Sequence, residues 1–329
     1  MVSIKHIRFI PGKQVMDPGI SQVRPERAER RFWTIEVGDV QGRIGLGEAA
    51  PWPGSGVSAT DLGNSTVAFE TNLIGRTVSL SELMNGRWQP PQCSAAAAHG
   101  IEQALLDLHG QAKQKPVEAL LNPESDSWVR THILVDGAKS VGQALSMGVT
   151  TFKVKGGRDL ETDDARLASI RSVAPNAAIR LDVNGNWSRE QAAFCLDRLS
   201  RHRLEWVEQP TPADDLESLG WLRARFPLSI AADESIIHHH RTILAEKLVQ
   251  VVIIKPMFLG GIVKARSIAS TALENGLEVC VTHALESAVG RRGALELAAS
   301  LNTKQTHGVS PLQLHQINDG VIHLHRGDV

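Results

Sequence analysis

The second half of the chain repeats one pattern, in which a short apolar run is followed by Gly or Pro and then by an amphipathic stretch. From about residue 129 the pattern returns at least seven times, about once every 22–28 residues, which is the size of one strand–helix unit. Such runs are typical of strands buried on both faces of a parallel sheet. They are His132–Val135, Thr151–Val154, Ala178–Val183, Leu204–Val207, Leu228–Ala232, Val249–Ile254 and Leu277–Val281.

The stretches between these runs have helical spacing. Ser188 with Gln191 has the sequence of a capping box, and Asn275-Gly276 predicts a helix end. So many strand–helix units in a row favour a closed (β/α) barrel of the α/β class over an open sheet. Two apolar stripes support the helices, namely Ala192, Ala193, Leu196 and Leu199, and Ala265, Ile268, Ala269, Ala272 and Leu273.

The first part of the chain has a different pattern and predicts a separate α+β domain. Antiparallel strands are expected at Ile4–Phe9, Phe32–Val37 and Arg43–Leu46, and an Ala-rich helix at Ser94–Leu108. We therefore divide the chain into an α+β domain at 1–124, a barrel at 125–304, and a last barrel strand with a C-terminal segment returning to the first domain at 305–329.

Charged residues follow the apolar runs. These positions are at the carboxyl ends of the expected strands, where the active sites of βα barrels lie. Alternation along a strand points Lys153 and Lys155 to one face, and Asp182 and Asn184 likewise. The charged residues follow one another at similar intervals along the chain. These intervals are 27 residues from Lys155 to Asp182, 26 from Asp182 to Glu208, 25 from Glu208 to Asp233 and 22 from Asp233 to Lys255. Each interval is about one strand–helix unit, so we expect these five residues at the same height on successive strands.

The residue types indicate a particular chemistry. Three carboxylates gathered in an apolar setting repel one another, and a hard divalent ion relieves this, with Mg²⁺ the natural choice and Mn²⁺ a substitute. A lysine beside a cation and a second lysine is expected to have a lowered pKa. A metal, carboxylates and a lysine base together suit removal of a proton α to a carboxylate.

With these residues the chain resembles the enolase superfamily, and paired lysines on the second and sixth strands resemble its muconate-lactonising subgroup. Within the subgroup, Gly45-Leu46-Gly47-Glu48-Ala49-Ala50-Pro51-Trp52-Pro53-Gly54 and His307-Gly308-Val309-Ser310 are similar to segments of the o-succinylbenzoate synthase family. The resemblance implies a (β/α)7β modified TIM barrel with an N-terminal α+β capping domain. It also implies Mg²⁺-dependent syn dehydration of 2-succinyl-6-hydroxy-2,4-cyclohexadiene-1-carboxylate in menaquinone or phylloquinone biosynthesis.

The same resemblance implies roles for single residues. Asp182, Glu208 and Asp233 would bind Mg²⁺, while Lys155 would remove the α-proton and return it to the departing hydroxyl. Lys153 would support Lys155, and Lys255 on the opposite face would steady the metal-stabilised enediolate. The expected substrate contacts are Asn184, Thr282, Glu286, Ser287 and Arg24, the last in a lid loop at Pro11–Glu29 that contains Gly12 and Gly19.

Other reactions use the same machinery. N-succinylamino acid racemisation, dipeptide epimerisation and muconate cycloisomerisation are the alternatives, and a non-catalytic scaffold is the alternative from another class. Dipeptide epimerases carry an Asp-x-Asp at the last strand for the substrate ammonium, whereas His307–Leu314 has no acid here. His283, near the seventh strand end, is interpreted as a structural or pocket-lining residue. Glu234 is interpreted as facing outward, because only one of Asp233 and Glu234 faces inward by alternation.

Composition excludes several classes of partner. Lys plus Arg number 35 against 36 for Asp plus Glu, so we expect neither nucleic acid nor an anionic membrane as partner. The chain has no Tyr, which leaves proton transfer to lysine, and its three Cys are widely spaced. Without an apolar leader or span, a cytoplasmic monomer or small homo-oligomer acting on a small carboxylate is expected.

Overall fold

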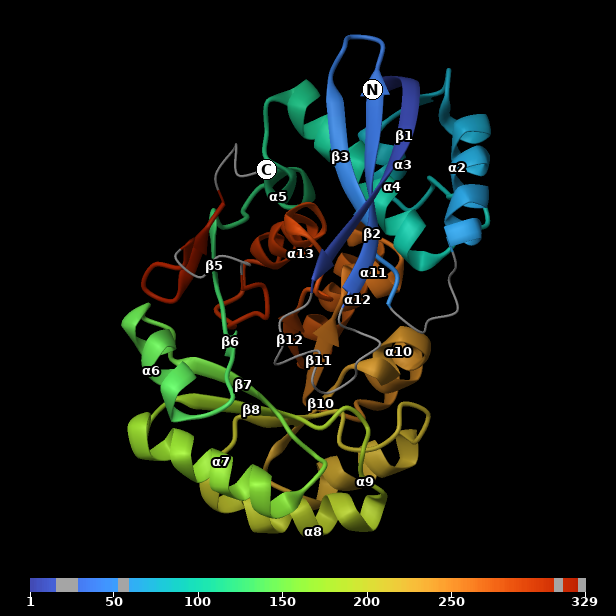
Figure 1. The fold of residues 1–329 in the computed structure, drawn as a ribbon. Helices are drawn as coiled ribbons and strands as arrows, with labels where there is room; N and C mark the ends of the chain where they lie inside the picture. The colour runs from blue at the N-terminus through green and yellow to red at the C-terminus, as the bar shows by residue number, and fades with distance from the viewer. Residues whose placement is uncertain (16–28, 53–58, 311–315, 325–329) are drawn as a thin grey trace.

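The computed structural model describes residues 1–329 except 16–28, 53–58, 311–315 and 325–329, which are drawn in grey in Figure 1. An antiparallel sheet with order β3-β2-β1-β4 forms the N-terminal part, at the top of that view. The strands expected at Ile4–Phe9, Phe32–Val37 and Arg43–Leu46 are confirmed. The elements of this part are β1 (Val2–Val15), β2 (Glu29–Asp39), β3 (Ile44–Ala49), α2 (Ala59–Leu73), β4 (Thr77–Val78), α3 (Leu80–Met84), α4 (Ala95–Lys113) and α5 (Val117–Leu121).

Helix α4 packs against β3 at two glycines of the Gly-x-Gly-Glu segment. Ser94 caps the helix by accepting from the backbone N–H of Ala97, so the Ala-rich helix begins where the sequence predicts. A Cβ atom on Gly45 would lie 2.1 Å from the carbonyl oxygen of Ala104, and one on Gly47 would lie 1.9 Å from that of Gly100. The glycines of this segment therefore allow strand and helix backbones to touch.

The second part is a parallel sheet with order β12-β11-β10-β9-β8-β7-β6. Its strands are β6 (Ile133–Leu134), β7 (Thr151–Lys155), β8 (Ala178–Asp182), β9 (Trp206–Glu208), β10 (Ser229–Ala232), β11 (Val251–Ile254) and β12 (Glu278–Val281). Figure 1 shows α7, α8 and α9 on the outer side of this sheet, away from the N-terminal part. The helices are α6 (Ala138–Ser146), α7 (Leu160–Val173), α8 (Arg189–Leu199), α9 (Leu216–Arg225), α10 (Glu234–Glu246), α11 (Pro256–Leu259), α12 (Ile262–Glu274) and α13 (Ala288–Ser300), with a 3₁₀ turn at Ser200–His202.

One segment near the C-terminus joins the two edges of the parallel sheet. His307 forms a parallel bridge with Thr131 beside β6, and Gly308 forms one with Thr282 beside β12. The modified barrel with an N-terminal capping sheet is thus confirmed, and so are the Ser188–Gln191 capping box and the end of α12 at Asn275.

The last strand, β13 (Val321–His323), pairs antiparallel with β5 (Trp128–Arg130), outside the parallel sheet. Of the loop expected at Pro11–Glu29, residues 11–15 extend β1 and Glu29 begins β2, because the hairpin is longer than the apolar pattern suggested. The remainder, which includes Arg24, lies outside the described residues. Over the described residues, no helix combines the length and apolarity that crossing a bilayer requires.

Candidate active site

Charged side chains from neighbouring strands meet at the carboxyl ends of β7, β8 and β9. The Nζ atom of Lys155 lies 2.5 Å from Oδ2 of Asp182, and that of Lys153 lies 2.7 Å from the same oxygen. Lys153 also donates to Oε1 of Glu208 at 2.6 Å. Both lysines of β7 therefore face one side of the strand, as alternation predicts.

The expectation that five residues lie at the same height is correct for three of them. Lys155 pairs in register with Asp182, and Asp182 with Glu208. Glu208 pairs with Ala231, so Asp233 lies two residues beyond that level, just after the end of β10. Because barrel strands are staggered, equal spacing along the chain does not give equal height.

Lys255 lies beyond the three strands that carry the carboxylates. It follows β11, and its ammonium donates to Asp233. Its Nζ atom lies 5.9 Å from the centre of the Phe258 ring. In the sheet order, β8, β9 and β10 lie between β7 and β11, so lysines stand on both sides of three carboxylates.

Burial and charge shift the protonation of this group strongly. Asp182, Glu208 and Asp233 are at most 2% exposed. Burial, together with the nearby Asp182 charge, raises the pKa of Glu208 to about 8. Burial also opposes ionisation of Asp182, but the Lys153 and Lys155 ammonium groups hold its pKa well below the ordinary value. Desolvation opposes the charge of Lys153, yet Asp182 and Glu208 raise its pKa well above the ordinary value. The lowered pKa expected for a lysine beside a bound cation stays a prediction.

The donor set fits a hard divalent cation. Three buried carboxylates with no His or Cys among them are the ligands that Mg²⁺ prefers. Within the described part of the chain, no three His, Cys, Asp or Glu side chains are grouped as a metal centre. Lysine ammonium groups lie between the carboxylates and neutralise them, as the contacts of Lys153 and Lys255 show.

Four of the five expected substrate contacts lie within the described residues. Asn184 lies at the site, where its Oδ1 accepts from Lys155 at 2.8 Å. Thr282 is buried after β12, and its hydroxyl has no hydrogen-bond partner in the described part of the chain. Glu286 accepts from the backbone N–H of Ala284, and Ser287 caps α13 by accepting from the N–H of Val289. Substrate contact by these residues stays a prediction, and Arg24 is not described.

The capping domain holds the loop after β12, through residues that the sequence reasoning did not select. Glu48, at the end of β3, accepts from the N–H groups of Ser287 and Gly290, both at 3.0 Å, and from the Ser287 hydroxyl. Arg30 of β2 donates to the carbonyl oxygens of Ala284 and Ala50. The Gly-x-Gly-Glu segment contained Glu48, but nothing local to it indicated a partner 239 positions away.

Glu234, which alternation along a strand placed facing outward, contacts a residue at the charged cluster. Strand β10 ends at Ala232 and α10 begins at Glu234, so strand alternation does not apply to this residue. Its Oε1 accepts from Nδ2 of Asn184 at 3.1 Å. His283 Nδ1 accepts from the N–H of Leu285 at 3.0 Å, and its role as a structural or pocket-lining residue stays a prediction.

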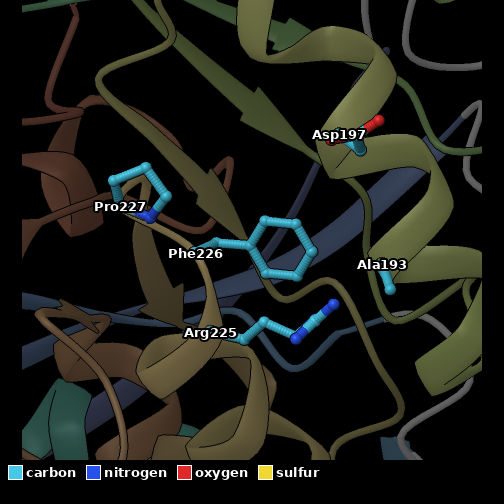
Figure 2. A pocket seen from close by; sticks show the side chains of 5 residues that line it. All are labelled: Ala193, Asp197, Arg225, Phe226 and Pro227. Carbon is cyan, nitrogen blue, oxygen red and sulfur yellow. The ribbon is translucent and has the colours of Figure 1, made fainter.

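A cavity of about 420 Å³ lies on the outer wall, between α8 and the link from α9 to β10. Figure 2 shows the Phe226 ring pointing toward the α8 residues Ala193 and Asp197. The cavity is also lined by Arg225 and Pro227, which precede β10 and lie toward the amino ends of the strands. This cavity is therefore separate from the charged cluster at the carboxyl ends.

Comparison with known proteins agrees with this geometry. Residues 14–122 match the mandelate racemase / muconate lactonizing enzyme N-terminal domain, and residues 136–329 match the enolase C-terminal domain-like family. The chain is 30% identical over 285 residues to a hydrophobic dipeptide epimerase of Enterococcus faecalis, covering 81% of this chain and 78% of that protein.

Two further relatives match over shorter lengths. The chain is 37% identical over 162 residues to an o-succinylbenzoate synthase of Thermobifida fusca, covering 47% of this chain and 50% of that protein. It is 30% identical over 214 residues to an N-succinyl-L-Arg/Lys racemase of Bacillus cereus, covering 62% and 58%.

A solved structure matches over nearly the whole chain. It is the dipeptide epimerase from Enterococcus faecalis V583 in complex with Mg and the dipeptide L-Leu-L-Tyr, with a TM-score of 0.83 and 24% identity, covering 98% of both chains. The fold, the paired lysines flanking three carboxylates and the two matched domains lead to one conclusion. The chain belongs to the mandelate racemase/muconate lactonizing enzyme group of the enolase superfamily.

Proposed function

We propose that this protein racemises or epimerises N-acylated amino acids, with N-succinylamino acids as the first substrate class to test. The observation that carries the proposal is the position of Lys155 and Lys255 on opposite sides of three buried carboxylates. Inverting a carbon centre requires one base to take the proton from one face and a second acid to return it from the other. Two lysines in this arrangement supply both.

The chain's residues divide the work as follows. Lys155 takes or returns the α-proton on one face and Lys255 does so on the other, while Lys153 stays paired with Asp182 and Glu208. Asp182, Glu208 and Asp233 would hold Mg²⁺. When bound, the ion supplies positive charge against the substrate carboxylate, which makes the α-proton more acidic.

The choice of an N-acyl substrate rests on charge. A free dipeptide carries an ammonium group, which needs an anionic partner when it is buried. The sequence from His307 to Leu314 contains no acid. Succinylation turns the ammonium into a neutral amide and adds a carboxylate, so an N-succinyl substrate needs no acid there. Whole-chain similarity to epimerases and partial similarity to an N-succinylamino acid racemase support this class of reaction.

o-Succinylbenzoate formation is the second candidate. Supporting it are the 37% identity of the matched portion to an o-succinylbenzoate synthase and the same acid-free segment. In that reaction Lys155 alone moves the proton, and the succinyl arm is shared with the first candidate. Comparison favours the first candidate, because the o-succinylbenzoate synthase matches only 47% of the chain and the epimerase 81%.

Exchange of the α-proton in D₂O, followed by NMR, tests the proposal. N-succinylamino acids, dipeptides and the cyclohexadiene substrate are run in parallel, with aromatisation of the last followed by absorbance. We expect exchange and inversion of N-succinylamino acids by the wild type. Lys155→Ala and Lys255→Ala should each abolish inversion, while Lys264→Ala, at an exposed position on α12, should not change it.

Three results decide between the candidates. Inversion of N-succinylamino acids that needs both lysines supports the racemase. Aromatisation without any inversion, lost in Lys155→Ala, replaces it with the second candidate. No turnover of any of these carboxylates overturns both.

A further inference from the structure

We propose that Glu234 is a positioning residue for Lys155 and that it acts through the side-chain amide of Asn184. It acts on Lys255 through its charge and through no hydrogen bond among the described residues. The inference rests on the proposed two-lysine function and assigns an unequal support to the two bases. Its basis is a chain of two hydrogen bonds: Lys155 Nζ donates to Asn184 Oδ1 at 2.8 Å, and Asn184 Nδ2 donates to Glu234 Oε1 at 3.1 Å.

The amide of Asn184 is directional, because it accepts hydrogen bonds at Oδ1 and donates them at Nδ2. An ionised carboxylate only accepts, so Glu234 requires the Nδ2 end of the amide. The Oδ1 end must then face Lys155, whose ammonium only donates. If Glu234 were absent, only the Lys155 ammonium would favour this orientation, and the amide would lose the contact that holds its Nδ2 end.

The backbone of Asn184 also helps to fix the position of its side-chain amide. Asn184 has a φ of 52°, in the left-handed region that asparagine tolerates better than most residues. Its own N–H donates to Oδ1 of Asp182 at 3.1 Å. Asn184 is thus held at both its backbone and its side chain beside the lysine that it contacts.

The two lysines differ in what surrounds them. Lys155 has a side chain that is 46% exposed, so it relies on hydrogen bonds for its position. Lys255 is 18% exposed and lies beside Phe258, where packing as well as the Asp233 contact restricts it. A side chain with more open surroundings loses more order when one contact is removed.

Two features of Glu234 support a role at this contact. It is the first residue of α10, where a negative charge is favourable next to the helix N-terminus. Its second oxygen, Oε2, is buried without a hydrogen-bond partner among the described residues. A buried carboxylate oxygen without a partner destabilises the fold, and such a cost is typical of residues kept for function.

The first test measures α-proton exchange for each enantiomer of an N-succinylamino acid separately. Lys155→Ala identifies the enantiomer whose proton Lys155 removes. For that enantiomer we expect Glu234→Ala to lower kcat by about 10-fold or more, in the range typical of lost outer-shell partners, and to change the other enantiomer's exchange less than about 3-fold. Glu234→Gln, which still presents an acceptor to Asn184, should restore most of the rate.

The second test needs no turnover. Trace labelling with acetic anhydride, read by mass spectrometry, compares Lys155 with the exposed Lys264 in the same molecule. Release of Lys155 from the Asn184 contact should raise its relative labelling several-fold in Glu234→Ala. The matched control is Glu246→Gln, at the exposed last residue of the same helix, which should leave both measurements unchanged.

The outcomes separate this inference from the proposed function. Equal loss of exchange for both enantiomers, or unchanged labelling of Lys155 in Glu234→Ala, overturns the positioning role. Absence of exchange by the wild type overturns the racemase function, while the labelling result still decides the contact between Glu234, Asn184 and Lys155.

Discussion

Arg180 offers a sharp test of how the barrel interior is held together. This arginine of β8 is 1% exposed, two residues before Asp182. Its guanidinium donates to Glu205 at 2.6 Å and to the Thr306 carbonyl at 2.8 Å, and it lies 2.7 Å from Nδ1 of His132. It therefore joins β8 to the residue before β9, to the residue before β6 and to the segment that joins the edges of the sheet.

The substitution Arg180→Met removes these contacts but keeps an apolar stem against the Trp206 ring, which the guanidinium now covers at 3.7 Å. Glu205 is 33% exposed and regains water. His132 Nδ1 stays buried without this partner, which costs about 1–3 kcal/mol, and loss of the hydrogen bond to the half-buried Thr306 carbonyl costs about 0.5–1.5 kcal/mol. The two together give about 1.5–4.5 kcal/mol.

Urea unfolding followed by circular dichroism measures this loss, from the midpoint at an unchanged slope. The matched control is Arg198→Met on α8, whose ion pair with Glu161 is 3.8 Å long and exposed, and which we expect to change stability by less than about 1 kcal/mol. If Arg180→Met loses no more stability than Arg198→Met, the buried arginine does not hold these strands and the reasoning is wrong.

Three further predictions follow. Chelation with EDTA should abolish α-proton exchange, and Mg²⁺ or Mn²⁺ should restore it; activity that resists chelation contradicts the three-carboxylate site. Burial raises the pKa of Glu102 to about 7 from 4.5, so the stability that it contributes is complete below pH 4.5 and is lost as pH rises through 7. Glu102→Gln should therefore reduce the fall in Tm between pH 5 and 8, and an unchanged Tm profile would refute this assignment. Gly47→Ala should cost about 1–3 kcal/mol in urea unfolding, because its Cβ would meet α4. In contrast Gly142→Ala, in open space on α6, should stabilise the protein by about 0.5–1 kcal/mol; equal effects would mean that the contact does not matter.

Alternation within a strand was a sound guide to the site. Lys153 and Lys155 share one face of β7 because their backbone is a regular strand, and both reach Asp182. The same rule did not extend to Glu234, because the strand before it had already ended and a helix begins at that residue. A rule based on period two holds only while the backbone keeps its extended conformation.

The height of the charged residues was predictable only in part. Register places Lys155, Asp182 and Glu208 in one row. Asp233 lies farther along its strand, since the stagger of neighbouring strands is set by closure of the whole barrel and not by the length of one strand–helix unit. The stagger nevertheless leaves Lys255 in contact with Asp233, because long side chains span it.

The sequence by itself determined the alternation of strands and helices, the antiparallel first part and the residue types at the strand ends. These are local properties, because each depends on apolar spacing, turn residues and caps within about one strand–helix unit. The tertiary structure alone decided that Glu48 binds the loop of Ser287 across 239 positions, that Arg180 joins distant strands, and that Glu234 reaches Lys155 through Asn184. These contacts join segments far apart in the chain, and only the packing of the complete fold sets the distance between such segments.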